Sequence, residues 1–270
     1  MEFPEETSMS ILDLNDKAAV VTGAGQGVGR QLALTLAAHG AKVVVNDYFL
    51  ERATQVAREI VDAGGKAIAV QADVTDLDGV RAMMRRTVDE FGTLDVLVNN
   101  AGNEGANPSS ASPKPFWETS PEDWQRWLGV NLFGVIACVT AATPYMIRQQ
   151  SGRLITIISD AGRVGESGIE VYSGGKAGAA GFMRAVARTL GRYNITANCV
   201  AIAATLTPTI APVIEAQPPE KTKRQLERYV IRRFGRPEDI SGLVTLLASD
   251  SSSWMTGQTY PVNGGFSFAM

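Results

Sequence analysis

The feature of this sequence that most restricts its fold is a regular alternation of two kinds of segment. Short apolar runs, rich in β-branched residues, lie at residues 18–23, 41–47, 66–73, 94–102, 153–159, 195–203 and 258–265. Such runs are typical of strands that are buried on both faces of a sheet. Longer amphipathic patterns, such as those at residues 29–40, 50–65 and 77–92, separate the runs and end at glycine. The alternation predicts an α/β fold: a single-domain, Rossmann-type, doubly wound parallel sheet of about seven strands with helices on both faces.

The organisation of the chain is simple. No internal repeat or linker divides it, and its 270 residues, 45% of them hydrophobic, suffice for one large core. We expect a flexible N-terminal extension at residues 1–10 and one domain at residues 11–270. The extension, MEFPEETSMS, lacks the basic start and apolar centre of a signal peptide, and no uninterrupted apolar run approaches a membrane span. The sequence therefore predicts a cytoplasmic protein without a membrane partner.

Charge and residue counts argue against several classes of function. The net charge is -3 and the basic residues are mostly scattered, so no nucleic-acid partner is expected. His39 is the only histidine, which disfavours Ser/His/Asp chemistry and most zinc sites. Cys138 and Cys199 lie in apolar surroundings and are expected to be buried, reduced thiols. No metal site is predicted.

A glycine-rich turn, TGAGQGVGR, follows the first predicted strand and opens the first helix. Its glycines have the spacing GxxxGxG, at Gly23, Gly27 and Gly29, and not the common GxGxxG. Glycine lets the backbone approach a ligand closely, and a helix N-terminus offers free N–H groups to a pyrophosphate. The turn indicates a dinucleotide site, although a merely tight turn has the same composition.

Asp47 ends the second apolar run, at about the distance from the glycines where an acidic residue meets the adenosine ribose. A carboxylate there accepts hydrogen bonds from the ribose hydroxyls and repels a 2′-phosphate. Neither Gln26 nor Tyr48 nearby is basic, so NAD is favoured over NADP. The alternative is a strand-end aspartate that only solvates a loop.

Five ordered motifs are similar to those of the classical short-chain dehydrogenase/reductase family, from about Leu14 to about Phe266. They are TGAGQGVG, NNAG at residues 99–102, Asn131 in VNLFG, Ser159 thirteen positions before Tyr172, and YSGGK from Tyr172 to Lys176. The resemblance and the turn together imply a cofactor site for NAD. Its expected residues are Gly23, Gln26, Gly27, Val28, Gly29, Asp47, Asp73, Val74, Asn100, Ala101, Gly102, Tyr172, Lys176 and Thr207. For Asp73, an exposed loop position is the alternative.

The predicted catalytic set is Ser159, Tyr172, Lys176 and Asn131. Tyr172 and Lys176 are one helical turn apart, so they project from one face, where the ammonium is expected to lower the pKa of the phenol. Tyr172 would take the hydroxyl proton of an alcohol while hydride leaves its carbon. By resemblance, Ser159 would hydrogen-bond the substrate oxygen, Lys176 would hold the nicotinamide ribose, and Asn131 would anchor a water in a proton relay. A Tyr and Lys exposed on a helix are the alternative.

Two glycines inside this helix, Gly174 and Gly175, each cost about 1 kcal/mol of helix stability relative to alanine. We expect them to allow the close approach of a neighbouring backbone or a partner subunit's helix. The resemblance implies a homotetramer, or a homodimer, through this helix.

The chain departs from the family pattern at two places. Ile202 and Ala203 stand where the family usually has Pro-Gly, so the seat of the nicotinamide is expected to differ slightly. Asp160 directly after Ser159 is also unusual, and is either a substrate-facing acid or a plain strand-end charge.

Substrate contacts are expected from two irregular segments, residues 103–118 and 208–237. Their candidates are Asn107, Phe116, Trp117, Ile210, Val213, Ile214 and Tyr229. This largely apolar set indicates a hydrophobic secondary alcohol or ketone, of cyclic, aromatic or steroid-like shape. One basic cluster is either a solvated helix face paired with Glu220 and Glu227 or a grip on the phosphates of a coenzyme A thioester. It comprises Arg224, Arg228, Arg232, Arg233 and Arg236.

The sequence thus predicts an NAD-dependent short-chain alcohol dehydrogenase or ketoreductase with a small-molecule substrate. Two alternatives stay open. One is an enzyme like the 3-oxoacyl-(acyl-carrier-protein) reductases, which usually use NADPH. The other is a non-catalytic NAD-binding regulatory protein, which has no evident need for the complete Ser, Tyr, Lys and Asn set.

Overall fold

The computed structural model describes residues 11–106 and 114–268, so the predicted N-terminal extension and Asn107 lie outside the described residues. Seven strands form one sheet in the order β3-β2-β1-β4-β5-β6-β7, and every neighbouring pair is parallel. The strands are β1 (Ala18–Val21), β2 (Lys42–Asp47), β3 (Lys66–Gln71), β4 (Val96–Asn99), β5 (Gly152–Ser159), β6 (Ile195–Ile202) and β7 (Thr259–Val262). The predicted fold class is confirmed.

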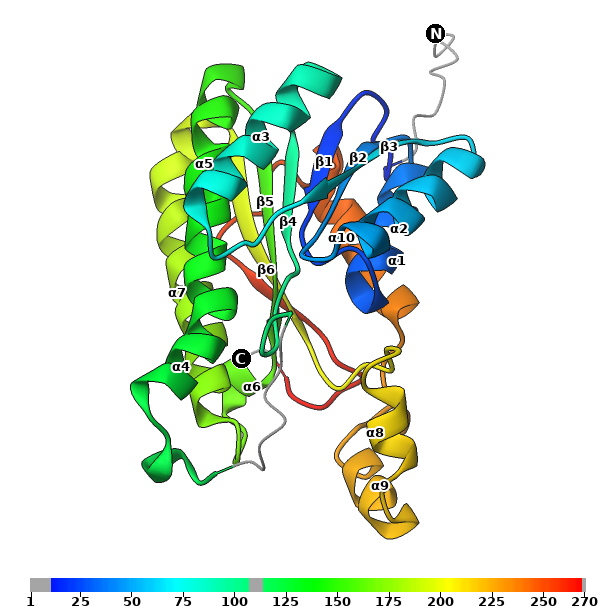
Figure 1. The fold of residues 1–270 in the computed structure, drawn as a ribbon, viewed down its shortest axis with the longest axis vertical. Coiled ribbons are helices and arrows are strands. Elements are labelled where there is room, and N and C mark those ends of the chain that lie inside the picture. The colour runs from blue at the N-terminus through cyan, green and yellow to red at the C-terminus, as the bar shows by residue number, and fades with distance from the viewer. Residues whose placement is uncertain (1–10, 107–113, 269–270) are drawn as a thin grey trace, which may run out of the picture.

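Helices cover both faces of the sheet (Figure 1). One face carries α1 (Gly27–Ala38), α2 (Leu50–Asp62) and α10 (Pro237–Ala248), whereas the other carries α3 (Leu77–Phe91), α5 (Gly134–Gln149) and α7 (Glu170–Leu190). Each face has its own buried apolar cluster. Successive side chains of a strand point to opposite faces of the sheet, so the central strands need apolar residues on both faces. In β1, Val20 belongs to one cluster and Val21 to the other.

The strand order reverses at β1, which lies between β2 and β4. The connections from β1 and β4 therefore leave in opposite directions, and a crevice opens between them at the carboxyl ends of the strands. This edge receives the glycine-rich turn after β1, Asp47 at the end of β2 and the NNAG segment after β4.

One long helical stretch, Pro121–Gln149, is apolar and long enough to cross a membrane by length and composition, with a mean hydropathy of 1.7 in its most apolar window. It consists of α4 (Pro121–Leu128), a π-helical turn at Gly129–Phe133, and α5. Its buried residues, including Cys138, Val139 and Ala142, belong to the core between the sheet and the helices. The stretch is accounted for as a core helix.

The segment after β6, expected to be irregular, contains two short helices, α8 (Ala211–Glu215) and α9 (Pro219–Leu226). Prolines stand in the first turn of both, where the missing N–H is not needed. The two helices project from the body of the molecule beyond the carboxyl ends of the strands (Figure 1). A further short helix, α6 (Ala161–Val164), directly follows Ser159.

Candidate active site

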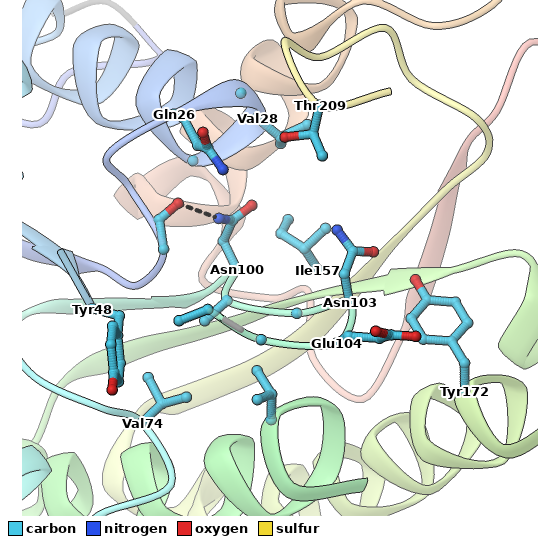
Figure 2. A pocket seen from close by; sticks show the side chains of 18 of the residues that line it. Gln26, Val28, Tyr48, Val74, Asn100, Asn103, Glu104, Ile157, Tyr172 and Thr209 are labelled. Atoms are coloured by element: carbon cyan, nitrogen blue, oxygen red, sulfur yellow. Dashed lines mark hydrogen bonds between the residues drawn. The ribbon is translucent and has the colours of Figure 1, made fainter. Parts of the chain in front are cut away.

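An elongated cavity of about 1040 Å³ follows the carboxyl edge of the sheet. Figure 2 shows Tyr48 and Val74 toward one end of it, Tyr172 and Glu104 at the other, and Asn100 between them. Because drug-sized ligands usually occupy about 300–1000 Å³, a cavity of this size and shape can hold a dinucleotide. Every residue predicted to bind the cofactor lines it, as does Ser159.

The glycine-rich turn lines the cavity with backbone atoms, because its close packing leaves no room for side chains. A Cβ at Gly23 would lie 2.9 Å from the Cα of Ala101, and one at Gly29 would lie 2.3 Å from the carbonyl oxygen of Gly23. Gly23 and Gly27 also have φ angles of +61° and +56°, which favour glycine. The turn therefore offers bare backbone and the N-terminus of α1, the arrangement that suits a pyrophosphate.

Asn100 joins this turn to the NNAG segment. Its side-chain amide donates to the carbonyl oxygens of Thr22 at 2.9 Å and Gly23 at 3.1 Å. In return, the Thr22 hydroxyl accepts the backbone N–H groups of Asn100 and Ala101. These bonds fix the distance between the two loops that face the ligand. Asn99 points elsewhere: it donates to the Thr156 hydroxyl at 3.2 Å and ties β4 to β5.

Asp47 lies at the adenosine end, and only 7% of its surface is exposed. Its two carboxylate oxygens each accept one backbone N–H, from Gly25 and from Phe49, both at 3.0 Å. Each oxygen keeps a second lone pair for a ligand hydroxyl. The sequence argument overlooked Arg52 in the first turn of α2, which lines the same corner with its guanidinium over the Phe49 ring at 4.4 Å.

Three further predicted residues complete the cofactor end. Val74 is buried, and the Asp73 carboxylate accepts the N–H and hydroxyl of Thr75, each at 2.8 Å. Asp73 therefore lines the cavity and also stabilises its own loop. Thr207 sits against the glycine turn, since a Cβ at Gly27 would lie 3.1 Å from its methyl group.

Ser159 and Tyr172 meet at the opposite end of the cavity, where β5 ends and α7 begins. The Ser159 hydroxyl accepts the N–H of Ala161 at 3.1 Å and also forms a hydrogen bond with the Tyr172 phenol. Burial raises the pKa of Tyr172, the hydrogen bond with Ser159 lowers it, and the charge of Glu166 raises it. The expectation that the neighbouring ammonium lowers this pKa is wrong, because desolvation is the largest effect and raises the pKa of Tyr172.

Lys176 lies one turn further along α7 and is 4% exposed. Its ammonium donates to the carbonyl oxygen of Ile157 at 2.9 Å and lies 5.8 Å from the centre of the Tyr172 ring. Burial lowers the pKa of Lys176 from its ordinary value to about 8. Any further hydrogen-bond acceptor that enters the pocket would therefore stabilise the ammonium form of Lys176.

Asn131 does not line the cavity but lies directly behind it, in the π-helical turn. Its amide donates to the carbonyl oxygens of Asn103 at 2.7 Å and Trp127 at 2.8 Å, whereas its buried Oδ1 has no hydrogen-bond partner in the described part of the chain. A Cβ at Gly102 would lie 3.1 Å from this Oδ1 and 3.2 Å from the Lys176 ammonium. The missing side chain of Gly102 leaves a small polar space beside an unsatisfied acceptor and a buried donor, which suits one water molecule.

The two glycines of YSGGK differ in their surroundings. A Cβ at Gly175 would touch Asn131 and Leu128 at 3.4 Å, so the helix α7 passes close to the segment that carries Asn131. No atom of residues 11–106 or 114–268 lies within 4 Å of a Cβ at Gly174, which is exposed. Close packing within the chain therefore explains Gly175 and does not explain Gly174.

Both departures from the family pattern lie at the catalytic end. Ile202, the last residue of β6, and Ala203, which follows it, both line the cavity. Asp160 does not line the cavity, is 2% exposed, and forms an ion pair with Arg163 at 2.7 Å. It is neither a substrate-facing acid nor a solvated strand end, because its side chain turns away from the pocket into a buried contact.

Among the expected substrate contacts that the structure describes, only Ile210 lines the cavity. Phe116, Trp117 and Val213 are exposed, Ile214 lines a separate groove, and Tyr229 is buried against the backbone. Two acids that the sequence argument missed, Glu104 and Glu166, line the catalytic end instead. The expectation of an apolar pocket with few charges is therefore wrong at this end. Hydropathy could not reveal these acids, because only the fold brings the loops after β4 and β5 together.

The arginine cluster is mostly solvated and pairs differently from the expectation. Arg228 forms an ion pair with Glu166 at 3.6 Å, and Arg233 one with Asp239 at 2.6 Å. The Arg224 guanidinium donates to the backbone carbonyl oxygen of Glu220 and not to its carboxylate. The expected pairing of the cluster with the carboxylates of Glu220 and Glu227 is not present among the described residues.

The parallel sheet, the glycine-lined cavity and the Ser, Tyr and Lys set define an oxidoreductase that acts on CH–OH or carbonyl groups with a nicotinamide cofactor. Comparison with known proteins narrows this class. Residues 23–267 match the family model described as enoyl-(acyl carrier protein) reductase. The chain belongs to the short-chain dehydrogenase/reductase family.

Several relatives are similar over nearly their whole length. A 3-oxoacyl-(acyl-carrier-protein) reductase, FabG of Staphylococcus aureus, is 40% identical over 92% of this chain and 97% of its own. BbsD of Thauera aromatica, a subunit of a hydroxy(phenyl)methylsuccinyl-CoA dehydrogenase, is 36% identical over 94% of this chain and 98% of its own. The solved structure of a 7α-hydroxysteroid dehydrogenase, in complex with NADH and 7-oxo glycochenodeoxycholic acid, is 35% identical with a TM-score of 0.86. It covers 94% of this chain and 95% of that one.

Proposed function

We propose that this protein is an NAD-dependent oxidoreductase that interconverts a secondary alcohol and a ketone. The observation that carries the proposal is that one continuous cavity joins Asp47 at one end to Ser159, Tyr172 and Lys176 at the other. Asp47 would hold the adenosine ribose of a nicotinamide dinucleotide, and Tyr172 would face its reactive ring. The 35% identical hydroxysteroid dehydrogenase, which binds NADH, supports this assignment.

The preference for NAD rests on Asp47. Its carboxylate is fixed by two backbone N–H groups and faces the cavity as an acceptor for ribose hydroxyls, and its negative charge opposes a 2′-phosphate. Arg52 at the same corner works in the other direction, since a guanidinium attracts phosphate. We propose that Asp47 prevails because it is nearly buried, where charges are screened less by solvent.

The nicotinamide of the bound cofactor supplies the hydride acceptor for oxidation and the hydride donor for reduction. Tyr172 takes the alcohol proton in one direction and returns it in the other, and Ser159 orients the substrate oxygen against the phenol. Lys176, whose buried ammonium lies one helical turn from Tyr172, binds the nicotinamide ribose. The unsatisfied Oδ1 of Asn131 and the space beside Gly102 hold a water that passes the proton on from Lys176.

Two substrate classes fit the proposal. A hydrophobic cyclic, aromatic or steroid-like alcohol is supported by the hydroxysteroid dehydrogenase relative, and a hydroxyacyl thioester by BbsD. A second candidate function, that of a 3-oxoacyl-(acyl-carrier-protein) reductase, is favoured by the 40% identity with FabG. Asp47 argues against this second candidate where the reaction depends on NADPH, because the carboxylate opposes the 2′-phosphate.

We also propose that the enzyme is a cytoplasmic homotetramer, or a homodimer. The exposed Gly174 on α7, which has open space where a side chain would be, supports a close contact between copies of this helix.

The experiment that tests the proposal follows the absorbance of reduced nicotinamide with either NAD or NADP. The panel contains steroidal, cyclic and aromatic secondary alcohols and 3-hydroxyacyl thioesters. The proposal predicts turnover of one class with NAD at a kcat/KM at least about tenfold higher than with NADP. A preference for NADPH with an acyl thioester would establish the second candidate instead. NAD binding without turnover of any compound would favour a binding protein.

A further inference from the structure

Asp160 presents a buried negative charge one residue beyond Ser159. Its Oδ1 accepts hydrogen bonds from Arg163 at 2.7 Å and from the Ser267 hydroxyl at 2.9 Å, and its Oδ2 accepts one from the Asn263 amide at 2.7 Å. A buried carboxylate is strongly unfavourable unless it is paired and hydrogen-bonded. The loop after Ser159 can therefore adopt this conformation only while these partners are in place.

Two of the partners come from the far end of the chain. Asn263 and Ser267 lie 103 and 107 residues beyond Asp160, directly after the edge strand β7. Arg163 also donates to the Ser267 hydroxyl at 2.7 Å and to the carbonyl oxygen of Phe268 at 3.0 Å. The C-terminal end of the described chain is thereby held beside α6 (Figure 1). We call Asp160, Arg163, Asn263 and Ser267 the C-terminal clasp.

The same C-terminal segment also touches the other wall of the pocket. Phe266 packs on Tyr229 with ring centres 5.2 Å apart, and Arg228 lies over Phe266 at 4.4 Å. The Tyr229 hydroxyl accepts the N–H of Ala204, a residue that lines the cavity, at 3.2 Å. The segment therefore connects the loop that carries Ser159 with the segment that follows β6.

The backbone beside Ser159 is fixed from the same side. The N–H of Asp160 donates to the carbonyl oxygen of Ile202 at 3.0 Å, so the two departures from the family pattern are bonded to each other. The clasp holds the side chain of Asp160, and this bond holds its main chain. Little rotational freedom remains for the adjoining peptide, and the Ser159 hydroxyl, which accepts the N–H of Ala161 at 3.1 Å, lies close enough to Tyr172 to lower its pKa.

We infer that Asp160 is a positioning residue, which acts through the C-terminal clasp to hold the Ser159 hydroxyl against Tyr172. The inference rests on the proposed roles of Ser159 and Tyr172. Asp160 does not touch the reacting atoms, so its loss misaligns Ser159 and leaves the cofactor end unchanged. A purely structural role for the clasp predicts a loss of stability without this misalignment.

The test compares Asp160→Asn and Arg163→Gln with Arg153→Gln. Arg153 is a matched control because it is a buried arginine, paired with Asp250 at 3.1 Å, at the opposite end of the same strand β5. Asp160→Asn keeps the shape of the side chain but removes its charge and turns an amide group toward its donors. Ser267→Ala is a milder variant that leaves the ion pair intact, so it keeps the test open if Asp160→Asn does not fold.

Two measurements decide the outcome. The first is steady-state kinetics per folded enzyme, where we expect about a tenfold lower kcat in Asp160→Asn and Arg163→Gln with an unchanged Kd for NAD. In Ser267→Ala we expect a loss of about two- to threefold. Arg153→Gln should lower the Tm and leave kcat unchanged.

The second measurement is the titration of Tyr172 by NMR of 13C-labelled tyrosine, assigned with Tyr172→Phe, which needs no substrate. Because the bond with Ser159 lowers the pKa of Tyr172, its loss in Asp160→Asn should move the titration to higher pH. Failure of the wild type to turn over any substrate would contradict the proposed function, whereas this titration would still decide the role of the clasp. An unchanged kcat and an unchanged titration in the folded Asp160→Asn or Ser267→Ala would overturn the inference.

Discussion

The two ends of the cavity are built in different ways. At the adenosine end the surface is mainly backbone: glycines leave no space for a Cβ, and Asp47 is fixed by the main-chain N–H groups of Gly25 and Phe49. At the catalytic end the surface depends on side chains from distant parts of the chain, such as Asp160 with Ser267 and Glu166 with Arg228. The first end is built mainly from backbone groups, whereas the second depends on pairs of side chains. Substitutions should therefore separate cofactor binding from chemistry.

The largest effect is expected for Lys176→Met, because Lys176 is proposed both to bind the nicotinamide ribose and to pass on the proton at the catalytic end. Turnover should fall by about 10³-fold or more, and NAD binding should weaken as well. Methionine is close to lysine in volume and removes a charge whose burial lowers its pKa to about 8. Steady-state kinetics and NAD titration check both effects, and near-normal turnover would contradict the role of Lys176.

Lys176→Met should also differ from the wild type in how its stability depends on pH. The pKa of Lys176 is lower in the folded protein than in the unfolded chain. Between about pH 8 and 10.5 the unfolded chain therefore keeps this proton while the folded protein loses it. The wild type should therefore become more stable relative to Lys176→Met as the pH rises from about 8 to 10.5, and the difference should be constant below this range. Denaturant unfolding of both proteins at several pH values measures it. A difference that is independent of pH would mean that Lys176 is not buried as described.

Ser159→Ala should disturb only the catalytic end. We expect kcat for alcohol oxidation to fall by about 10²-fold, with an NAD affinity close to that of the wild type. The loss of the hydrogen bond also raises the pKa of Tyr172 further, so the rise of oxidation rate with pH should move to more alkaline values. The pH dependence of kcat/KM checks the direction of this shift, and a shift to lower pH would contradict the hydrogen bond.

Asp47→Asn should disturb only the adenosine end. The ratio of kcat/KM for NAD to that for NADP should fall by about 10- to 100-fold, because a charged acceptor is lost and Arg52 is no longer opposed. Saturating kcat should be unchanged, since Tyr172 is at the other end. Kinetics with both cofactors tests this, and Arg52→Gln in the same background should reverse the gain for NADP.

The smallest effect is expected for Trp117→Ala. Trp117 is 72% exposed and packs mainly on Phe116, outside the cavity. Its removal should change kcat/KM less than about twofold for any substrate of the panel. A large loss would mean that the loop after β4 closes over the substrate.

These contrasts explain which parts could be predicted from the sequence. Apolar alternation defined the sheet, and the fixed spacing of Gly23, Gly27 and Gly29 indicated the turn, because both depend on neighbours in the chain. The π-helical turn places Asn131 behind Gly102, and no sequence pattern predicts this turn. Glu104 and Glu166 were missed, and Phe116 and Trp117 were selected wrongly, because loop packing decides which side chains face a pocket. Asp160 was singled out as unusual, but its partners lie more than 100 residues away.

The most direct measurement of the central claim is a single-turnover comparison of Tyr172→Phe with the wild type. Tyr145→Phe is a suitable control, because Tyr145 packs against Arg148 on α5 outside the cavity. We predict that Tyr172→Phe binds NAD with a Kd within about twofold of the wild type, while hydride transfer slows by about 10³-fold or more; Tyr145→Phe should match the wild type in both. Hydride transfer at a near-normal rate in Tyr172→Phe would contradict the account.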